Sequence, residues 1–322
     1  MVILAVKPER HRTRGRKREA IVLRPTQSVG DAFQLVANAY GQALARHCSA
    51  IHRHSDPETI HRMRIAIRRL LTAMSALTTT ADDPARTAIK LKLHRLQKAL
   101  SGPRDADTWL ETLAKNDQGL TAQELASLRN AVLAVRASEL AECRQLCRSH
   151  AYRAIGREIG AWVRSGSWRD NFSLMPITLY SGQYLAKLDH KIRKRTKSIS
   201  KLDEAATHKL RIRVKKARYA TELFAPLFKK GPAKKLKRHS EAMERLQSAL
   251  GALTDLASHQ RIAKIMFARD EFSQNPALSL LAGIVLGQEL GARTKLMKAA
   301  GKACKQYRKM PPPVTWTGPR HT

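Results

Sequence analysis

The chain has 322 residues, with 60 Lys and Arg against 26 Asp and Glu, and a formal net charge of +34. A field of this strength predicts a polyanionic partner, such as nucleic acid, anionic lipid or polyphosphate, because helical surfaces normally mix both signs. Four cysteines form no disulfide framework and the longest apolar run, 277–286, cannot span a bilayer, which predicts a protein of the reducing cytoplasm.

The two ends of the chain differ in composition from the middle. Residues 1–27 carry a run of basic residues from Lys7 to Arg18 with little periodicity, which predicts a mobile basic arm. The short apolar run 20–23 predicts at most one strand-like contact. Three consecutive prolines, 311–313, end regular structure, so we expect residues 311–322 to form a Pro-rich tail.

In the first half of the chain, apolar residues recur at helical spacing. They predict helices over 28–54, 57–77, 84–102, 121–149 and from there to about 164. Ser28 and Asp56 stand where N-caps are expected, and Pro57 suits the first turn that follows Asp56. Gly102-Pro103 predicts a break after the third helix.

The second half restarts near Ile177, after a join over 165–176. Its apolar periodicity predicts helices over 177–201, 207–224, 234–247, 254–268 and 276–308. Residues 187–238 hold 19 basic and 4 acidic residues, a net +15 that repels itself unless an anion is nearby. No segment shows convincing strand periodicity, so we predict an all-α fold.

Two of the expected helices carry the same pattern of charge. On a helical wheel, His208, Arg211 and Lys215 fall on one side of 207–224, nearly opposite the apolar stripe, and Lys216 flanks them. The helix over 59–77 repeats this pattern with His61, Arg64 and Arg68, flanked by Arg69. Each helix therefore presents a row of cations about one turn apart, and its opposite, apolar face is expected to pack in the core.

A second landmark follows each charged helix. Leu96-Gln97-Lys98-Ala99-Leu100-Ser101-Gly102 precedes Arg104-Asp105, and Leu246-Gln247-Ser248-Ala249-Leu250-Gly251 precedes Thr254-Asp255. The offsets are 147 residues for the charged helices and 150 for this segment. Two landmarks in one order at nearly one offset predict an internal duplication, with repeats over 28–170 and 171–310.

The pattern His-x-x-Arg-x-x-x-(Arg/Lys)-(Arg/Lys), twice, each time followed by Leu-Gln-x-x-Leu-(Gly/Ser) and an Asp, resembles the CHAD domain over about 28–309. The resemblance implies an all-helical domain of two pseudo-symmetric bundles that share a basic groove or pore. It also implies binding of long-chain inorganic polyphosphate and residence on polyphosphate granules with their proteins. The sequence departs from the pattern at Ser101, where Gly is usual, and at Thr254, where Arg is usual.

The repeated stripes supply the expected phosphate ligands. We expect Arg64, Arg68, Arg69, Arg211, Lys215 and Lys216 to carry most of the affinity, because arginine grips phosphate oxygens bidentately and lysine acts as a point charge. His61 and His208 either donate to phosphate or pack between helices, and we favour ligand contact. Arg95 and Arg245 occupy matched positions in the next helices and are expected to extend the row of cations that binds polyphosphate.

Asp105 has two alternative roles in the sequence, and neither is favoured. It either binds a motif arginine and fixes its direction, or caps the helix that follows. Cys143 and Cys147 lie one turn apart with His150 a turn further, but no fourth ligand follows, so buried packing explains the pair better than a metal. We predict no metal and no cofactor.

Non-specific nucleic-acid binding is the main alternative function, because counterion release would favour DNA or RNA at low salt. Aromatic residues make up only 5% of the chain, so few side chains are available for bases to stack on. No phosphate-binding Gly-rich loop or nucleophile-elbow motif occurs, so we predict that the protein is not an enzyme. The Glu-x-Glu-x-Lys pattern of a CYTH-type triphosphatase is also missing, and membrane binding is not expected, because the charged faces are backed by core stripes.

Overall fold

The structure is a computed structural model that describes residues 21–53, 56–78, 83–114, 119–170, 172–197, 204–269 and 275–313. Within these ranges the fold is all-α and no strand is present, as the sequence predicts. The helices are α1 Val29–Ala50, α2 Pro57–Ala76, α3 Pro84–Ala99, α4 Ser101–Leu113, α5 Ala122–Arg148, α6 His150–Arg153, α7 Ile155–Ser165, α8 Ile177–Thr196, α9 Glu204–Phe224, the 3-10 turn η2 Ala225–Leu227, α10 Lys230–Phe267, α12 Pro276–Gly291 and α13 Arg293–Lys309.

Local capping sets the starts of the first two helices. The Ser28 hydroxyl accepts from the Asp31 backbone N–H at 3.0 Å while the Asp31 carboxylate accepts from the Ser28 N–H, which is a capping box. The Asp56 carboxylate accepts from the Thr59 N–H at 2.9 Å, ahead of Pro57 in the first turn. Both predicted N-caps are confirmed, and the second one fixes where the charged helix α2 begins.

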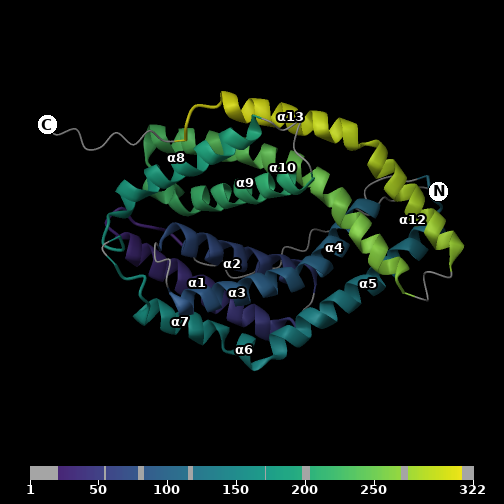
Figure 1. The fold of residues 1–322 in the computed structure, drawn as a ribbon, viewed down its shortest axis with the longest axis horizontal. Coiled ribbons are helices and arrows are strands. Elements are labelled where there is room, and N and C mark those ends of the chain that lie inside the picture. The colour runs from purple at the N-terminus through teal and green to yellow at the C-terminus, as the bar shows by residue number, and fades with distance from the viewer. Residues whose placement is uncertain are drawn as a thin grey trace, which may run out of the picture.

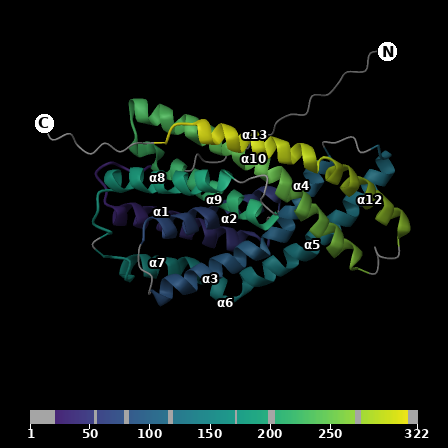
Figure 2. The same ribbon diagram turned by 45° about the horizontal axis from the view of Figure 1, so that its top comes forward.

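The helices form two layers that meet along α2 and α9, the helices that carry the charged stripes (Figure 1). Helices α1–α7 build one layer, and α8, α9, α13 and the first part of α10 build the other. The last part of α10 leaves its own layer and packs with α12 against α4 and α5, as Figure 2 shows from a second direction. The two charged helices are thereby held face to face.

Three clusters of buried side chains hold this arrangement. The largest lies in the first layer but also takes in Ile177 and Tyr184 of α8 and Phe224 of α9. A second cluster joins α4 and α5 to the end of α10 and to α12, with Trp109 at its centre fully buried. The third lies among α8, α9, α10 and α13. Because two of the three clusters draw residues from both sides of position 170, the proposed division into two repeats does not coincide with separate cores.

Several expected helix boundaries were wrong. Helix α10 runs without a break from Lys230 to Phe267, although we predicted two helices over 234–247 and 254–268. Pro232 lies in its first turn, where a missing N–H costs nothing, and Gly251 continues the helix within it. Conversely, the predicted helix 276–308 is divided at Ala292 into α12 and α13. The break near 102 falls one or two residues earlier, at Leu100, with α4 beginning at Ser101.

The start of the described chain is attached to the join between the halves. The Val29 N–H donates to the Met175 carbonyl at 2.8 Å, and the Ile177 N–H donates to the Gln27 carbonyl at 3.1 Å. Ser28 and Pro176 form an isolated bridge, and Leu23 is fully buried. Residues 21–27 of the predicted arm therefore belong to the fold, whereas residues 1–20 and the tail beyond 313 lie outside the described residues.

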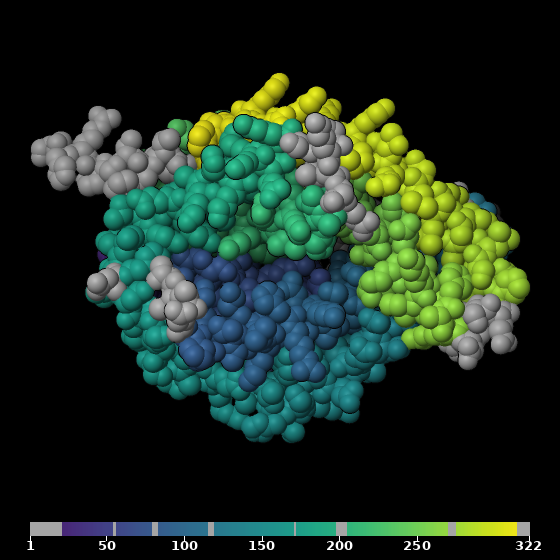
Figure 3. Space-filling model, in the orientation of Figure 1, coloured from purple at the N-terminus to yellow at the C-terminus, as the bar shows by residue number. Residues whose placement is uncertain are grey.

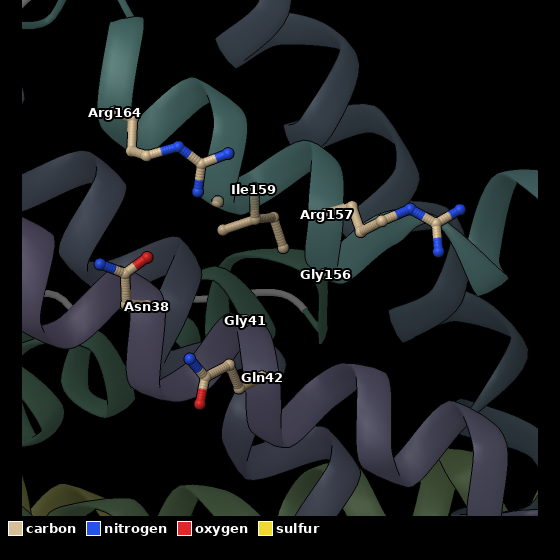
Figure 4. A pocket seen from close by; sticks show the side chains of 8 residues that line it. Asn38, Gly41, Gln42, Gly156, Arg157, Ile159 and Arg164 are labelled. Carbon is tan, nitrogen blue, oxygen red and sulfur yellow. The ribbon is translucent and has the colours of Figure 1, made fainter.

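Close glycine contacts bring α7 against α1, outside the interface between the two charged helices. A Cβ on Gly156 would lie 2.8 Å from the Ala45 Cβ, and one on Gly41 would lie 2.9 Å from Ile159 Cγ2. A small pocket of about 260 Å³ remains beside this contact, where the Arg164 side chain extends toward Ile159 and the Arg157 side chain extends away from it (Figure 4). We therefore interpret this region as helix packing that supports the first layer.

Candidate functional site

A groove of about 1100 Å³ lies between the two layers, with α2, α3 and α4 on one side and α9 and α10 on the other. Figure 3 shows it as a hollow between the blue residues of the first layer and the teal and green residues of the second. Among the described residues that line it, eight are Lys or Arg and only one, Asp105, is acidic. The cations of the groove are Arg64, Arg68, Lys98, Lys209, Arg211, Lys215, Lys216 and Arg261.

The matched arginines of the two charged helices occupy similar surroundings. The Arg64 guanidinium donates to the Leu100 carbonyl at 2.7 Å and to the Ser101 hydroxyl at 3.2 Å. Arg211 packs against Gly251, which belongs to the matching segment of the second half. A Cβ built on Gly251 would lie 3.8 Å from the Arg211 guanidinium. Burial, and then the charge of Arg68, lowers the pKa of Arg64 to about 10. Each arginine is thus anchored where its helix meets its neighbour.

Arg68 and Lys215 face the groove one turn beyond these arginines. Among the described residues, neither side chain has a hydrogen-bond or ion-pair partner. Burial, followed by the charges of Arg68, Arg211 and Arg64, lowers the pKa of Lys215 to about 6. Burial and the nearby Lys191 and Lys90 also lower the pKa of Lys216. The groove therefore holds more positive charge than its own carboxylates balance.

The acidic groups beside the groove are each bound to an arginine. Asp255 lies 3.5 Å from Arg211, and Asp105 lies 3.0 Å from Arg261. Asp105 therefore takes neither of its two predicted roles: it lies inside α4, and its arginine partner comes from the end of α10. It is Asp255, at the corresponding place in the second half, that contacts a motif arginine.

The groove gathers six of the ten candidate ligands: Arg64, Arg68, His208, Arg211, Lys215 and Lys216. The other four candidates, His61, Arg69, Arg95 and Arg245, are not among its lining residues. Arg69 instead donates to the Tyr40 hydroxyl at 2.8 Å and lies 3.2 Å from Glu222, so it joins α2 to α1 and α9.

The remaining three lie on other helix faces. Arg95 is exposed and interacts electrostatically with Tyr152 of α6, and Arg245 is exposed on α10. His61 lies at an exposed position near Arg104, and desolvation together with that charge lowers its pKa. A predicted groove-facing position can be wrong by a single residue, because consecutive side chains on a helix point about 100° apart.

Four basic residues of the groove were not among the predicted ligands: His94 and Lys98 of α3, Lys209 of α9 and Arg261 of α10. His94 and Lys98 are spaced i, i+4, which indicates a shared face of this helix. We predicted Arg95 as the phosphate ligand instead, one position away from that face. Arg261 lies outside both motifs, and no local pattern marks it. Apolar groups also line the groove, among them Ile212, which is 53% exposed.

The cysteines form a buried group away from the groove. A hydrogen bond with Cys147, and then burial, raises the pKa of the Cys143 thiol. Cys147 in turn contacts Cys48 of α1, whereas His150 is exposed. Within the described ranges, no set of three or more His, Cys, Asp or Glu side chains could hold a metal ion. No helix in the same ranges is long and apolar enough to cross a membrane.

The helical layers and the cationic groove between them define the class, an all-α protein with a groove suited to anions. The family model of the CHAD domain matches residues 35–263, which is most of the chain. The chain therefore belongs to the CHAD domain family.

Solved structures show the same fold. The crystal structure of the CHAD domain from the plant Ricinus communis is similar with a TM-score of 0.72 at 23% identity, covering 89% of this chain and 95% of that one. PptA from Streptomyces chartreusis is similar with a TM-score of 0.60 at 15% identity, covering 87% of this chain and all of that one. No curated protein matches the sequence.

Proposed function

We propose that the groove binds long-chain inorganic polyphosphate. The observation that carries this proposal is the pair of charged helices α2 and α9, which face each other across the groove with Arg68 and Lys215 unpaired. Such a cluster destabilises the free protein through self-repulsion, and a bound polyanion relieves it. Membership of the CHAD family supports this ligand, because the resemblance of both motif copies implies it.

Polyphosphate matches the groove better than nucleic acid does. It carries about one negative charge per phosphate and has no bases, so its receptor needs rows of cations and no stacking platform. The aromatic residue that lines the groove, Tyr219, is only 8% exposed and lies beside Arg218. The exposed groove surface therefore offers charge and hydrogen-bond donors, with little on which a base could stack.

The proposed role is binding without catalysis. The carboxylates near the groove, Asp105 and Asp255, are engaged with arginines, so neither is set up as a ligand for the Mg²⁺ that phosphoryl transfer normally uses. We further propose that such binding places the protein on polyphosphate granules in the cytoplasm, together with granule proteins. Non-specific nucleic-acid binding at low salt would follow from the net charge of +34.

A competition titration tests the proposal. Long-chain polyphosphate, duplex DNA and single-stranded RNA compete for the purified protein at about 150 mM salt, where weak screening-sensitive binding is suppressed. We expect polyphosphate to bind at least 100-fold more tightly than either nucleic acid. If a nucleic acid binds as well or better, the groove is a general polyanion site and the alternative function replaces ours.

A further inference from the structure

Apart from Arg68, the arginines that line the groove beside Lys215 are paired with other groups. Arg211 is paired with Asp255, Arg261 with Asp105, and Arg64 with the Leu100 carbonyl. Glu222, the next carboxylate along α9, lies 3.2 Å from Arg69 and 3.6 Å from Arg218. The charge of Asp255 favours the Lys215 ammonium, but this carboxylate is paired with Arg211, and no hydrogen bond or ion pair joins Lys215 to a carboxylate among the described residues.

The surroundings of this amine combine a nucleophile with an anion site. Lys215 is partly buried and lines the groove together with Arg64, Arg68 and Arg211, whose positive charges disfavour its protonation. Because its pKa is lowered to about 6, the amine is largely unprotonated at neutral pH and carries a free lone pair. The same guanidinium groups are suited to bind a phosphate beside it.

We propose that Lys215 is a site of Nε-acylation by small acyl phosphates, whose phosphate binds to Arg68 and its neighbouring guanidinium groups. In this reaction the lone pair of the Lys215 amine attacks the acyl carbon, and a C–N bond forms. The C–O bond to phosphate breaks, inorganic phosphate leaves with the bonding electrons, and the amine proton passes to water or to the phosphate. No oxidant, reductant or metal is required.

Acylation would change what the groove can bind. A bound polyanion favours protonation of the free amine, but the amide nitrogen cannot be protonated, so acylation prevents this cation from forming and adds bulk to the middle of the groove. We expect acetylated protein to bind polyphosphate at least fivefold more weakly. This consequence rests on the proposed function, whereas the acylation itself requires only that the groove bind a phosphate group.

Peptide mapping by mass spectrometry tests the proposal on the full-length protein. Acetyl phosphate is the probe at pH 7.5, and the early rates of acetylation are compared at Lys215 and at two other groove lysines, Lys98 and Lys209. We expect Lys215 to react at least tenfold faster than either. Equal rates at the three lysines would overturn the proposal.

A second reagent separates anion binding from simple reactivity. An acetyl N-hydroxysuccinimide ester has no phosphate, so Arg68→Gln should slow acetylation of Lys215 by acetyl phosphate at least fivefold and slow its reaction with the ester much less. Equal slowing with both reagents would contradict the role of the phosphate. If Lys215 reacts selectively but polyphosphate neither binds nor protects it, the acylation proposal holds and the polyphosphate proposal fails.

Discussion

At the scale of single residues, the groove disfavours protonation of Lys215. Its side chain is partly buried, forms no hydrogen bond or ion pair among the described residues, and has its pKa lowered by burial and by the charges of three arginines. A lysine in this position costs folding free energy at every pH at which the unfolded chain carries it protonated, because burial and like charge both disfavour the charged form in the folded protein. A bound anion relieves this penalty, so the same cluster of cations that destabilises the free protein favours ligand binding.

Replacing this lysine should stabilise the protein in a pH-dependent way. The pKa of Lys215 is lowered from 10.5 to about 6, so between these values the unfolded chain binds more protons and stability rises with pH. The penalty is fully present below pH 6 and is lost as pH approaches 10.5. We expect Lys215→Met to raise the free energy of unfolding by more than about 1 kcal/mol at pH 6.

Chemical denaturation at pH 6, 8 and 10 measures this effect, and the gain should shrink with each step upward. The exposed lysine of the same groove wall, Lys209, supplies the control variant Lys209→Met. An equal gain from both substitutions at every pH would show that the effect belongs to the overall charge and not to the site.

Charge reversal in the groove should weaken binding more than the same reversal elsewhere. We expect the double substitution Arg68→Glu and Lys215→Glu to weaken polyphosphate binding at least tenfold, about 1.4 kcal/mol, because it places two anions where phosphates should lie. Arg12→Glu with Arg14→Glu in the basic arm changes the net charge equally. A filter-binding or calorimetric titration compares them, and equal losses would indicate diffuse attraction.

At the scale of helices, small residues decide how closely the supporting elements approach. Helix α7 lies on α1 through Gly156 and Gly41, and this contact supports α1, on whose other side α2 packs. The neighbouring Gly160 has a different environment, because a Cβ there would lie 3.4 Å from the end of the flexible Arg164 side chain. The two glycines of one helix therefore offer a matched comparison.

We expect Gly156→Ala to destabilise the fold by about 1–3 kcal/mol, since the Ala45 Cβ that it would meet at 2.8 Å belongs to a rigid helix. Gly160→Ala should be neutral, or stabilising by up to about 1 kcal/mol, because Arg164 moves aside and alanine favours the helix. Thermal unfolding of both variants tests the contrast. A stable Gly156→Ala protein would show that α7 shifts freely on α1.

At the scale of the whole molecule, the two halves of the chain share their cores and their charges. The largest buried cluster includes Phe224 and Tyr184 from the second half, and the cluster around Trp109 needs Ile262 from α10. Ion pairs also cross between the halves, from Arg69 to Glu222 and from Arg261 to Asp105. The groove exists only where both halves are present.

Neither half should therefore fold alone. We expect a chain of residues 1–170 to be helical but loosely packed, with exposed apolar surface, because α2 loses its contact with α9, and α4 and α5 lose their contacts with α10 and α12. Dye binding and near-ultraviolet circular dichroism would measure this, and addition of residues 171–322 should restore tertiary packing. Cooperative unfolding of residues 1–170 by themselves would instead establish two independent domains.

Sequence by itself determined the helical class, the starts of α1 and α2, and the charged faces of α2 and α9. These features depend on local chemistry: Ser28 and Asp56 cap the residues that follow them, and the spacing of Arg64 from Arg68 fixes a shared face within one helix. The family resemblance also rested on contiguous motifs, which the family match confirms. The internal duplication stays a prediction.

Tertiary structure alone decided which faces meet. A helical wheel places residues around the axis of one helix but does not say how that helix is rotated relative to its neighbours. In the structure, Arg69 and Arg95 lie outside the groove and Lys98 lines it. Arg261 and Asp105 became partners across 156 positions of sequence, a pairing that no local pattern encodes. The continuity of α10 was decided in the same way, because packing against α4, α5 and α12 outweighs the weak helix preference of Gly251.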